Sequence, residues 1–248
     1  PLLLDINKQG CLNGHTPFSA MLAFYTLLAS LFSGVRNIAL SNESSANEST
    51  VPGTDVNHQY SKSLEFENDF RHYVSRLLFP RQAADEVPNY FSFLRPLSEL
   101  QIAMLFAQNE QYYPVFKSCN AGCKQDIWCG NCPKCLFAYI ILSPFIEPAK
   151  LQQIFGKDLF DDPQLQLYFD QLTGKEPTKP FECVGTIDEV NTAVAMTLDR
   201  WYVTTPRPTL LQGCQPPQPT VQLNTYFEQH NLDNETFNVL KQCIEKAN

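Results

Sequence analysis

Glycine and positive charge are both scarce in this sequence. Its 248 residues include 10 glycines, no two of them adjacent, and 18 lysines and arginines against 26 aspartates and glutamates. The net charge of −8 argues against nucleic acid as a partner, because phosphate backbones are bound by basic surfaces. The glycine-rich phosphate loops Gly-x-x-x-x-Gly-Lys-Ser/Thr and Gly-x-Gly-x-x-Gly are absent, as are His-Glu-x-x-His and Gly-x-Ser-x-Gly. The chain alone therefore has no familiar means of cradling a triphosphate.

Long apolar stretches are lacking as well. The longest, 18–32, is shorter than the roughly 20 residues that cross a bilayer, and polar residues interrupt it. No export signal opens the chain, so we expect a soluble, cytoplasmic protein with no membrane partner. In a reducing compartment, the nine cysteines favour metal ligands or buried thiols over disulfides. Residue 1 is proline and not methionine, so we expect the chain to be part of a longer protein.

The hydrophobic content of 44% is enough for a sizeable core. Strands alternate with helices in the first part of the chain, which predicts an α/β fold. Strands are expected at 35–40 and 90–94, and helices at 17–33, 62–79, 98–106, 136–142, 149–155, 163–172, from 186 onward and at 235–245. Helix 17–33 is nearly all apolar, so we expect it to be buried. Five prolines between 206 and 219 predict an extended linker.

We divide the chain at residue 147. Residues 1–147 are expected to be the C-terminal part of an α/β domain of nucleotide-binding type, and they include the cysteine-rich segment 119–135. Residues 148–248 are expected to form a mainly helical region.

Four cysteines form the strongest motif, Cys119-x9-Cys129-x2-Cys132-x2-Cys135. Four thiolates satisfy the tetrahedral preference of zinc, and a Cys-x-x-Cys turn directs two sulfurs to one point. Because four protein ligands leave no open coordination position, the predicted site is structural and not catalytic. The alternative is a cluster of ordinary thiols in a tight loop. Cys123 is the spare cysteine of this segment.

A second group of polar side chains comes just before the helix expected at 62–79. His58, Tyr60, Ser61 and Lys62 combine a proton-transfer group, two hydroxyls and a cation at a place where free backbone N–H groups favour an anion. The segment is therefore a candidate phosphate or carboxylate site. The alternative is a helix cap with a solvated lysine.

Two further pairs are candidates for ligand binding. Asn42 and Glu43 follow the first expected strand, and open α/β sheets bind ligands beyond the carboxyl ends of their strands. Glu43 suits a magnesium ion or a ribose hydroxyl. Asn13 and His15 lie just ahead of the first expected helix. The alternative for both pairs is a structural turn or cap.

Five segments, in one order from residue 12 to residue 189, together resemble the MurL family of bacterial epimerases, which act on UDP-N-acetylmuramoyl-L-alanyl-L-glutamate. They are LNGHTPFSAMLAFYTLLAS, ALSNESSANE, VNHQYSKSLEFE, SCNAGCKQDIWCGNCPKCLF and KPFECVGTIDE. The resemblance implies an open parallel sheet of the N-type ATP pyrophosphatase (PP-loop) kind. The cysteine pattern is similar to that of 7-cyano-7-deazaguanine synthase, where it holds zinc. The Ser-Gly-Gly-x-Asp-Ser type loop of that group is missing here; we expect it upstream of Pro1, and we expect this chain alone to be inactive.

The resemblance implies an isomerase that uses ATP and Mg²⁺ to invert the terminal L-glutamate to D-glutamate through an acyl adenylate, for peptidoglycan synthesis. We hypothesise that His58 or Lys62 is the base or pairs with the glutamyl carboxylate, with Tyr60 as an acid on the opposite face and Cys123 as an alternative base. Substrate- or nucleotide-binding roles fall to Asn13, His15, Asn42, Glu43 and Ser61.

Two other functions remain open at this point. The first is an ATP-pyrophosphatase relative that adenylates a carboxylate to make an amide or nitrile. The second is a non-catalytic zinc-knuckle interaction module, which would bind metal without nucleotide.

Overall fold

The structure, a computed structural model, describes residues 17–49, 53–54, 56–83, 86–180 and 182–247. Asn13 and His15 lie outside the described residues, so their proposed roles remain predictions. The chain divides into two compact units, Pro1–Ile38 with Asn68–Tyr90, and Ala39–Glu67 with Phe91–Asn248. The predicted division at residue 147 stays a prediction.

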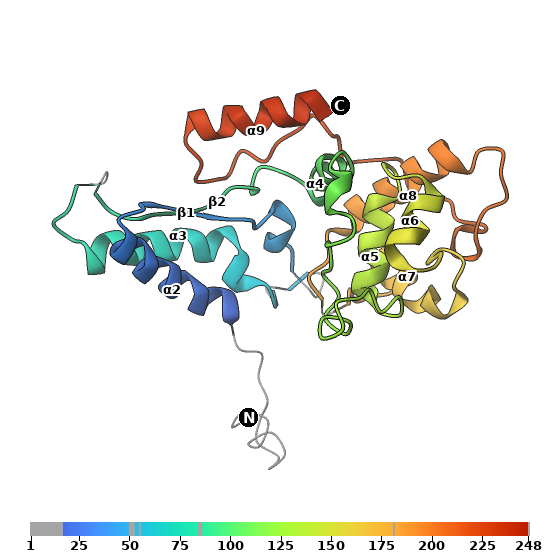
Figure 1. The fold of residues 1–248 in the computed structure, drawn as a ribbon, viewed down its shortest axis with the longest axis horizontal. Coiled ribbons are helices and arrows are strands. Elements are labelled where there is room, and N and C mark those ends of the chain that lie inside the picture. The colour runs from blue at the N-terminus through green and yellow to red at the C-terminus, as the bar shows by residue number, and fades with distance from the viewer. Residues whose placement is uncertain (1–16, 50–52, 55, 84–85, 181, 248) are drawn as a thin grey trace, which may run out of the picture. The chain divides into compact units, whose positions relative to one another are not determined.

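The described elements are mostly helices (Figure 1). They are α2 Phe18–Ser33, β1 Asn37–Leu40, α3 Leu64–Tyr73 with a π-helical turn Val74–Leu78, β2 Asn89–Ser92, α4 Glu99–Ala107, α5 Pro133–Leu142, α6 Pro148–Phe155, α7 Gln166–Leu172, α8 Ile187–Trp201 and α9 Asn234–Ala247. Both predicted strands and all the predicted helices are present, with ends displaced by a few residues.

The two strands form a small parallel sheet. Asn89 donates its amide to the Arg36 carbonyl at 2.9 Å, and Phe93 donates to the Leu40 carbonyl at 2.7 Å. From the first bond to the second, the donor and the acceptor both move four residues toward the C-terminus, as the two strands of a parallel pair do. The α/β class is therefore confirmed.

In the first unit, α2 packs against aromatic side chains of α3. The Phe24 ring lies 5.1 Å from that of Phe70, which in turn lies 4.7 Å from that of Tyr90. The prediction that α2 is buried is wrong: Phe18 is 61% exposed and Phe32 is 89% exposed. The helix is apolar on all sides, and one neighbour covers only one of them. No helix among the described residues has both the length and the apolar composition to cross a bilayer.

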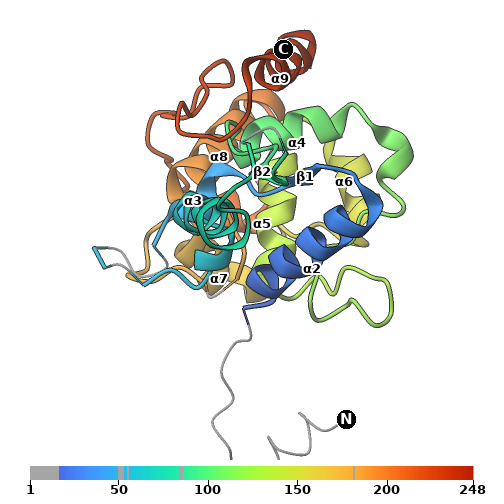
Figure 2. The same cartoon turned by 90° about the vertical axis from the view of Figure 1, so that its left-hand side faces the viewer.

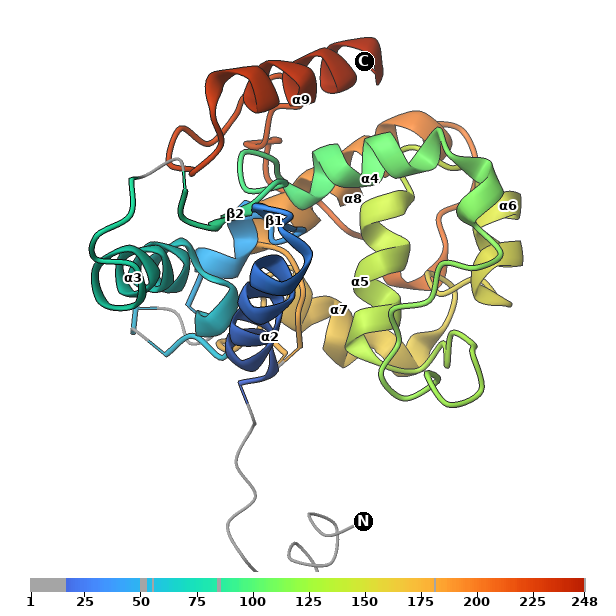
Figure 3. The ribbon, with the colours of Figure 1, turned by 60° about the vertical axis from the view of Figure 1, so that its left-hand side comes forward.

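The core of the second unit surrounds α5. Figures 2 and 3 show α5 among α4, α6, α7 and α8, and residues 135–142 of α5 are all buried. Three residues of α8, Val190, Ala193 and Val194, are fully buried in the same cluster. The last helix, α9, packs Leu240 and Ile244 beside α4 in a smaller cluster.

Capping boxes fix where two helices of the second unit begin, α4 and α8. Ser98 and Gln101 form a capping box at the start of α4, and Thr186 and Glu189 form one at the start of α8. The proline-rich segment is not a free linker, however. Leu210 and Leu211 are buried in the core, and the Leu210 amide bonds to the Phe160 carbonyl at 2.9 Å, because these two side chains are apolar enough to pack.

Candidate functional site

A fully buried arginine joins the loops that follow the two strands in the second unit. Arg95 donates one N–H to the Glu43 carbonyl and another to the Lys62 carbonyl, each at 2.6 Å. Its guanidinium also forms an ion pair with buried Glu67 at 3.4 Å. A buried charge is tolerated when it is paired and hydrogen-bonded, so Arg95 fixes both loops relative to α3.

The loop after β1 is held by further bonds. Ser44 Oγ donates to the Leu97 carbonyl at 2.9 Å, and the Asn57 side chain donates to the Ala46 carbonyl at 2.8 Å. Ser45 Oγ donates to Glu43 Oε1 at 3.1 Å. This loop was predicted as either a ligand site or a surface turn. It is a tightly bonded turn in which Ser44, Ser45 and Ala46 are buried.

At the start of α3, two backbone amides that could have bound an anion are hydrogen-bonded to side chains of the protein. The Leu64 amide donates to Asn47 Oδ1 at 2.8 Å, and the Phe66 amide donates to Ser63 Oγ at 3.1 Å. These two amides of the first turn are therefore already bonded within the protein.

Lys62 reaches a cysteine 121 positions further along the chain. Its Nζ lies 3.2 Å from the Cys183 Sγ, and Lys134 Nζ donates to the Cys183 carbonyl at 3.0 Å. Two ammonium groups thus flank one residue in a protein that is acidic as a whole.

Three carboxyl groups share this region. Burial first, and then repulsion from Glu43 and Glu189, raise the pKa of Glu99 well above its usual value, although Lys134 and Lys62 oppose the shift. Burial also raises the pKa of Glu189, whose Oε1 accepts the Glu99 amide at 2.7 Å. The raised pKa means that Glu99 holds its proton to a higher pH than an exposed glutamate does.

The structure brings together some of the predicted site residues. Arg95 links Glu43 to Lys62, and the Asn42 side chain donates to Ser92 Oγ at 3.1 Å, beside β2. His58 and Ser61 are half-buried, and Tyr60 is exposed.

Five residues were missed by sequence reasoning: Arg95, Glu99, Lys134, Cys183 and Glu189. Lys134, Cys183 and Glu189 stand inside quoted segments, whereas Arg95 and Glu99 lie outside all of them. Cys183 and Glu189 stand in KPFECVGTIDE, which was quoted only for the family resemblance.

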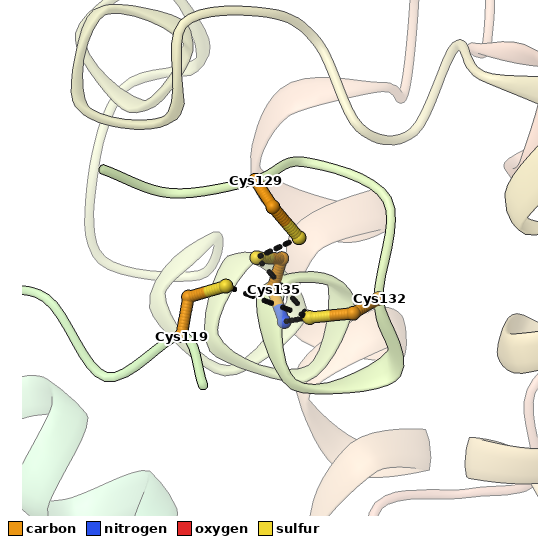
Figure 4. Close-up of side chains that lie close together, drawn as sticks. All are labelled: Cys119, Cys129, Cys132 and Cys135. Carbon is orange, nitrogen blue, oxygen red and sulfur yellow. Dashed lines mark hydrogen bonds between the residues drawn. The ribbon is translucent and has the colours of Figure 1, made fainter. Parts of the chain in front are cut away.

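The four predicted metal ligands converge in the second unit. Figure 4 shows the side chains of Cys119, Cys129, Cys132 and Cys135 directed toward one another, and their sulfurs all lie within 4.8 Å. Individual pairs are 3.4 to 3.8 Å apart. A zinc–sulfur bond of about 2.3 Å gives a tetrahedron whose sulfurs are about 3.8 Å apart, so the four thiols fit such an ion.

Backbone geometry supports the same cluster. The Gly122 amide donates to Cys119 Sγ at 3.2 Å, and the Cys135 amide donates to Cys132 Sγ at 3.4 Å. Gly130, between two of the ligands, has a φ of 66°, which favours glycine. Hydrogen bonding from Cys135 lowers the pKa of Cys132 to about 5, so this thiol ionises readily. Cys123 is exposed and is not a member of the cluster.

These features define a class: an α/β protein with charged loops beyond the carboxyl ends of parallel strands and a four-thiol cluster able to hold a metal ion. Two family models match the chain, that of the MurL N-terminal domain over residues 1–93 and that of the MurL C-terminal domain over residues 115–207. The chain belongs to the MurL family, as its sequence segments indicated.

Similar proteins support this membership. The chain is 42% identical over 208 residues to a protein of Xanthomonas oryzae pv. oryzae, an alignment that covers 81% of this chain and 45% of that protein. It is 38% identical over 202 residues to one of Salinispora tropica, covering 79% and 43%. Both are named UDP-N-acetyl-alpha-D-muramoyl-L-alanyl-L-glutamate epimerase. The chain thus spans a little under half the length of these relatives. No solved structure shows significant similarity to it.

The raised pKa of Glu99 predicts a pH-dependent stability. In the unfolded chain Glu99 ionises at its ordinary pKa, so the stability contributed by the protonated form is complete below that pKa and falls as pH rises toward the folded-state value. Glu99→Gln should therefore raise the free energy of unfolding relative to the unsubstituted chain at pH 7 and have little effect near pH 4. Urea denaturation across this range measures the difference.

The exposed Glu65→Gln serves as the control and should show no such pH-dependent gain. If Glu99→Gln and the unsubstituted chain kept the same stability difference from pH 4 to pH 7, the assignment of a raised Glu99 pKa would be wrong.

Proposed function

We propose that the protein to which this chain belongs inverts the terminal L-glutamate of UDP-N-acetylmuramoyl-L-alanyl-L-glutamate, in the cytoplasm, for peptidoglycan synthesis. The observation that carries this proposal is the match to both MurL domains, together with relatives at 36–42% identity that are named as this epimerase. The charged cluster around Lys62, Glu99 and Cys183 supports a proton-transfer reaction on an anionic substrate.

Activation of the substrate explains a requirement for ATP and Mg²⁺. A C–H bond beside an ionised carboxylate resists deprotonation, because the enolate would add a second negative charge next to the first. If the glutamyl α-carboxylate attacks the α-phosphate of ATP, pyrophosphate leaves and an acyl adenylate forms, in which the carboxylate charge is gone. A base then removes the α-proton, the enolate is reprotonated on its other face, and water releases AMP and the D-glutamyl product.

The chain's residues divide between holding the substrate and moving the proton. We assign the base, or the partner of the glutamyl carboxylate, to His58 or Lys62, and the opposite acid to Tyr60. The position of Lys62 Nζ beside Cys183 supports an anion-binding role. Roles in binding substrate, magnesium or nucleotide go to Asn13, His15, Asn42, Glu43 and Ser61.

We further propose that the β1–β2 pair is part of a larger open parallel sheet of the PP-loop kind. Its parallel register and the polar loops after both strands are consistent with such a sheet, which binds ligands at the carboxyl ends of its strands.

The proposed reaction predicts that His58→Gln lowers α-proton exchange by at least about 100-fold, because a positioned base supplies roughly that factor. The measurement uses this chain within a polypeptide of the relatives' full length, incubated with the UDP-muramoyl dipeptide, ATP and Mg²⁺ in D₂O. Deuterium at the α-carbon, D-glutamate and AMP are then quantified together. His72→Gln, an exposed change on α3, is the matched control and should leave exchange unchanged.

Near-normal exchange in His58→Gln would remove His58 from the mechanism and leave Lys62 as the candidate base. An ammonia adduct in place of inverted glutamate would instead favour a carboxylate-adenylating synthetase. Inversion without any nucleotide would contradict the proposed activation.

We also propose that the four clustered thiols bind one structural Zn²⁺. Their sulfur spacing supports this choice, and four thiolates leave no position for a substrate. Bound zinc would tie the loop 119–132 to the first turn of α5. Metal bound only in the folded state adds to stability.

The zinc proposal predicts about one zinc ion per chain by elemental analysis of the purified protein. Cys132→Ser should lose most of the metal and lower the melting temperature, since one of four ligands is gone. Cys123→Ser changes an exposed thiol of the same loop and should retain the metal. Equal zinc content in the two variants would contradict the assignment.

A further inference from the structure

Helix α2 carries a second apolar stripe on the side opposite its buried residues. The large side chains of this stripe recur at the spacing of helical turns, and each of them is substantially exposed. The exposed fractions are Phe18 61%, Met21 40%, Leu22 37%, Tyr25 60%, Leu28 49% and Phe32 89%. At about 100° per residue these positions fall within an arc of about 120°. The buried Ala23, Leu27 and Ser30 lie on the other side of the helix.

This stripe is large for a surface that faces water. At about 200 Å² per large side chain, the exposed fractions correspond to roughly 670 Å² of side-chain surface, slightly more than the largest apolar patch on a typical monomer. No charged residue occurs between Phe18 and Ser33. Helices that lie on a membrane surface carry lysine or arginine on their polar face, so the composition favours a protein partner.

We propose that this stripe packs against the part of the MurL protein that the present chain does not span. Helix α2 lies within the residues that match the N-terminal domain, and the chain covers only 43–45% of its relatives' length. A helix that is apolar on both sides belongs between two layers of one fold. The occupant is therefore an uncharged, apolar face of a sheet or helix in the remainder of the protein. The inference rests on family membership and not on the proposed activity.

Hydroxyl-radical footprinting with mass spectrometry tests the proposal without any need for turnover. The chain alone and the same chain within a polypeptide of the relatives' full length are labelled side by side. Phe18, Met21, Tyr25 and Phe32 should be labelled several-fold less in the longer polypeptide. Phe227, which is 52% exposed and lies outside α2, should be labelled equally in both.

Equal labelling of the stripe in the two polypeptides would overturn the proposal. Protection in the chain alone that increases with its concentration would also overturn it, because a second copy would then be the occupant.

A substitution provides an independent readout. Phe32→Ser should lower the melting temperature of the longer polypeptide by several degrees and leave that of the chain alone nearly unchanged. Val203→Ser, another apolar-to-serine change at a residue that is 74% exposed, is the control and should shift neither. An unchanged melting temperature of the longer Phe32→Ser polypeptide would contradict the packing.

Discussion

The buried guanidinium of Arg95 is the interaction on which the candidate site depends. It lies in the loop after β2, binds the carbonyls of Glu43 and Lys62 in the connection between β1 and α3, and pairs with Glu67 at the start of α3. A guanidinium suits this task because its donors point in several fixed directions in one plane. Without it, the two carbonyls and the Glu67 carboxylate would each lose a buried partner, and no other cation among the described residues bonds to all three.

The four-thiol cluster and the charged cluster are connected through the first turn of α5. Cys132 caps this helix by accepting the Cys135 amide, and Lys134, which stands between these two cysteines, reaches the Cys183 carbonyl. The helix itself is the centre of the core. Fixing the thiols therefore fixes one of the two ammonium groups beside Cys183, so a structural metal would affect the site without touching a substrate.

Local signals predicted the helices and the cysteine cluster well, because capping boxes and Cys-x-x-Cys turns are set by neighbours in sequence. The segments KPFECVGTIDE and VNHQYSKSLEFE were recognised, but the meeting of Cys183 with Lys62 was not, since it depends on packing across 121 positions. Arg95 carried no motif at all, and its role follows only from burial. The exposure of α2 was not predicted, because an apolar composition shows that burial of a helix would be favourable. It does not show whether neighbouring elements cover that helix.

Native-state hydrogen exchange of an Arg95→Met variant tests the central claim most directly, with Arg200→Met as the control at another arginine bonded to a backbone carbonyl. If Arg95 holds the two loops, the amides of Ser44, Lys62 and Leu64 exchange faster in Arg95→Met, while those of α5 keep their protection. Unchanged exchange at those three amides, or an equal loss of protection throughout α5, would contradict the account.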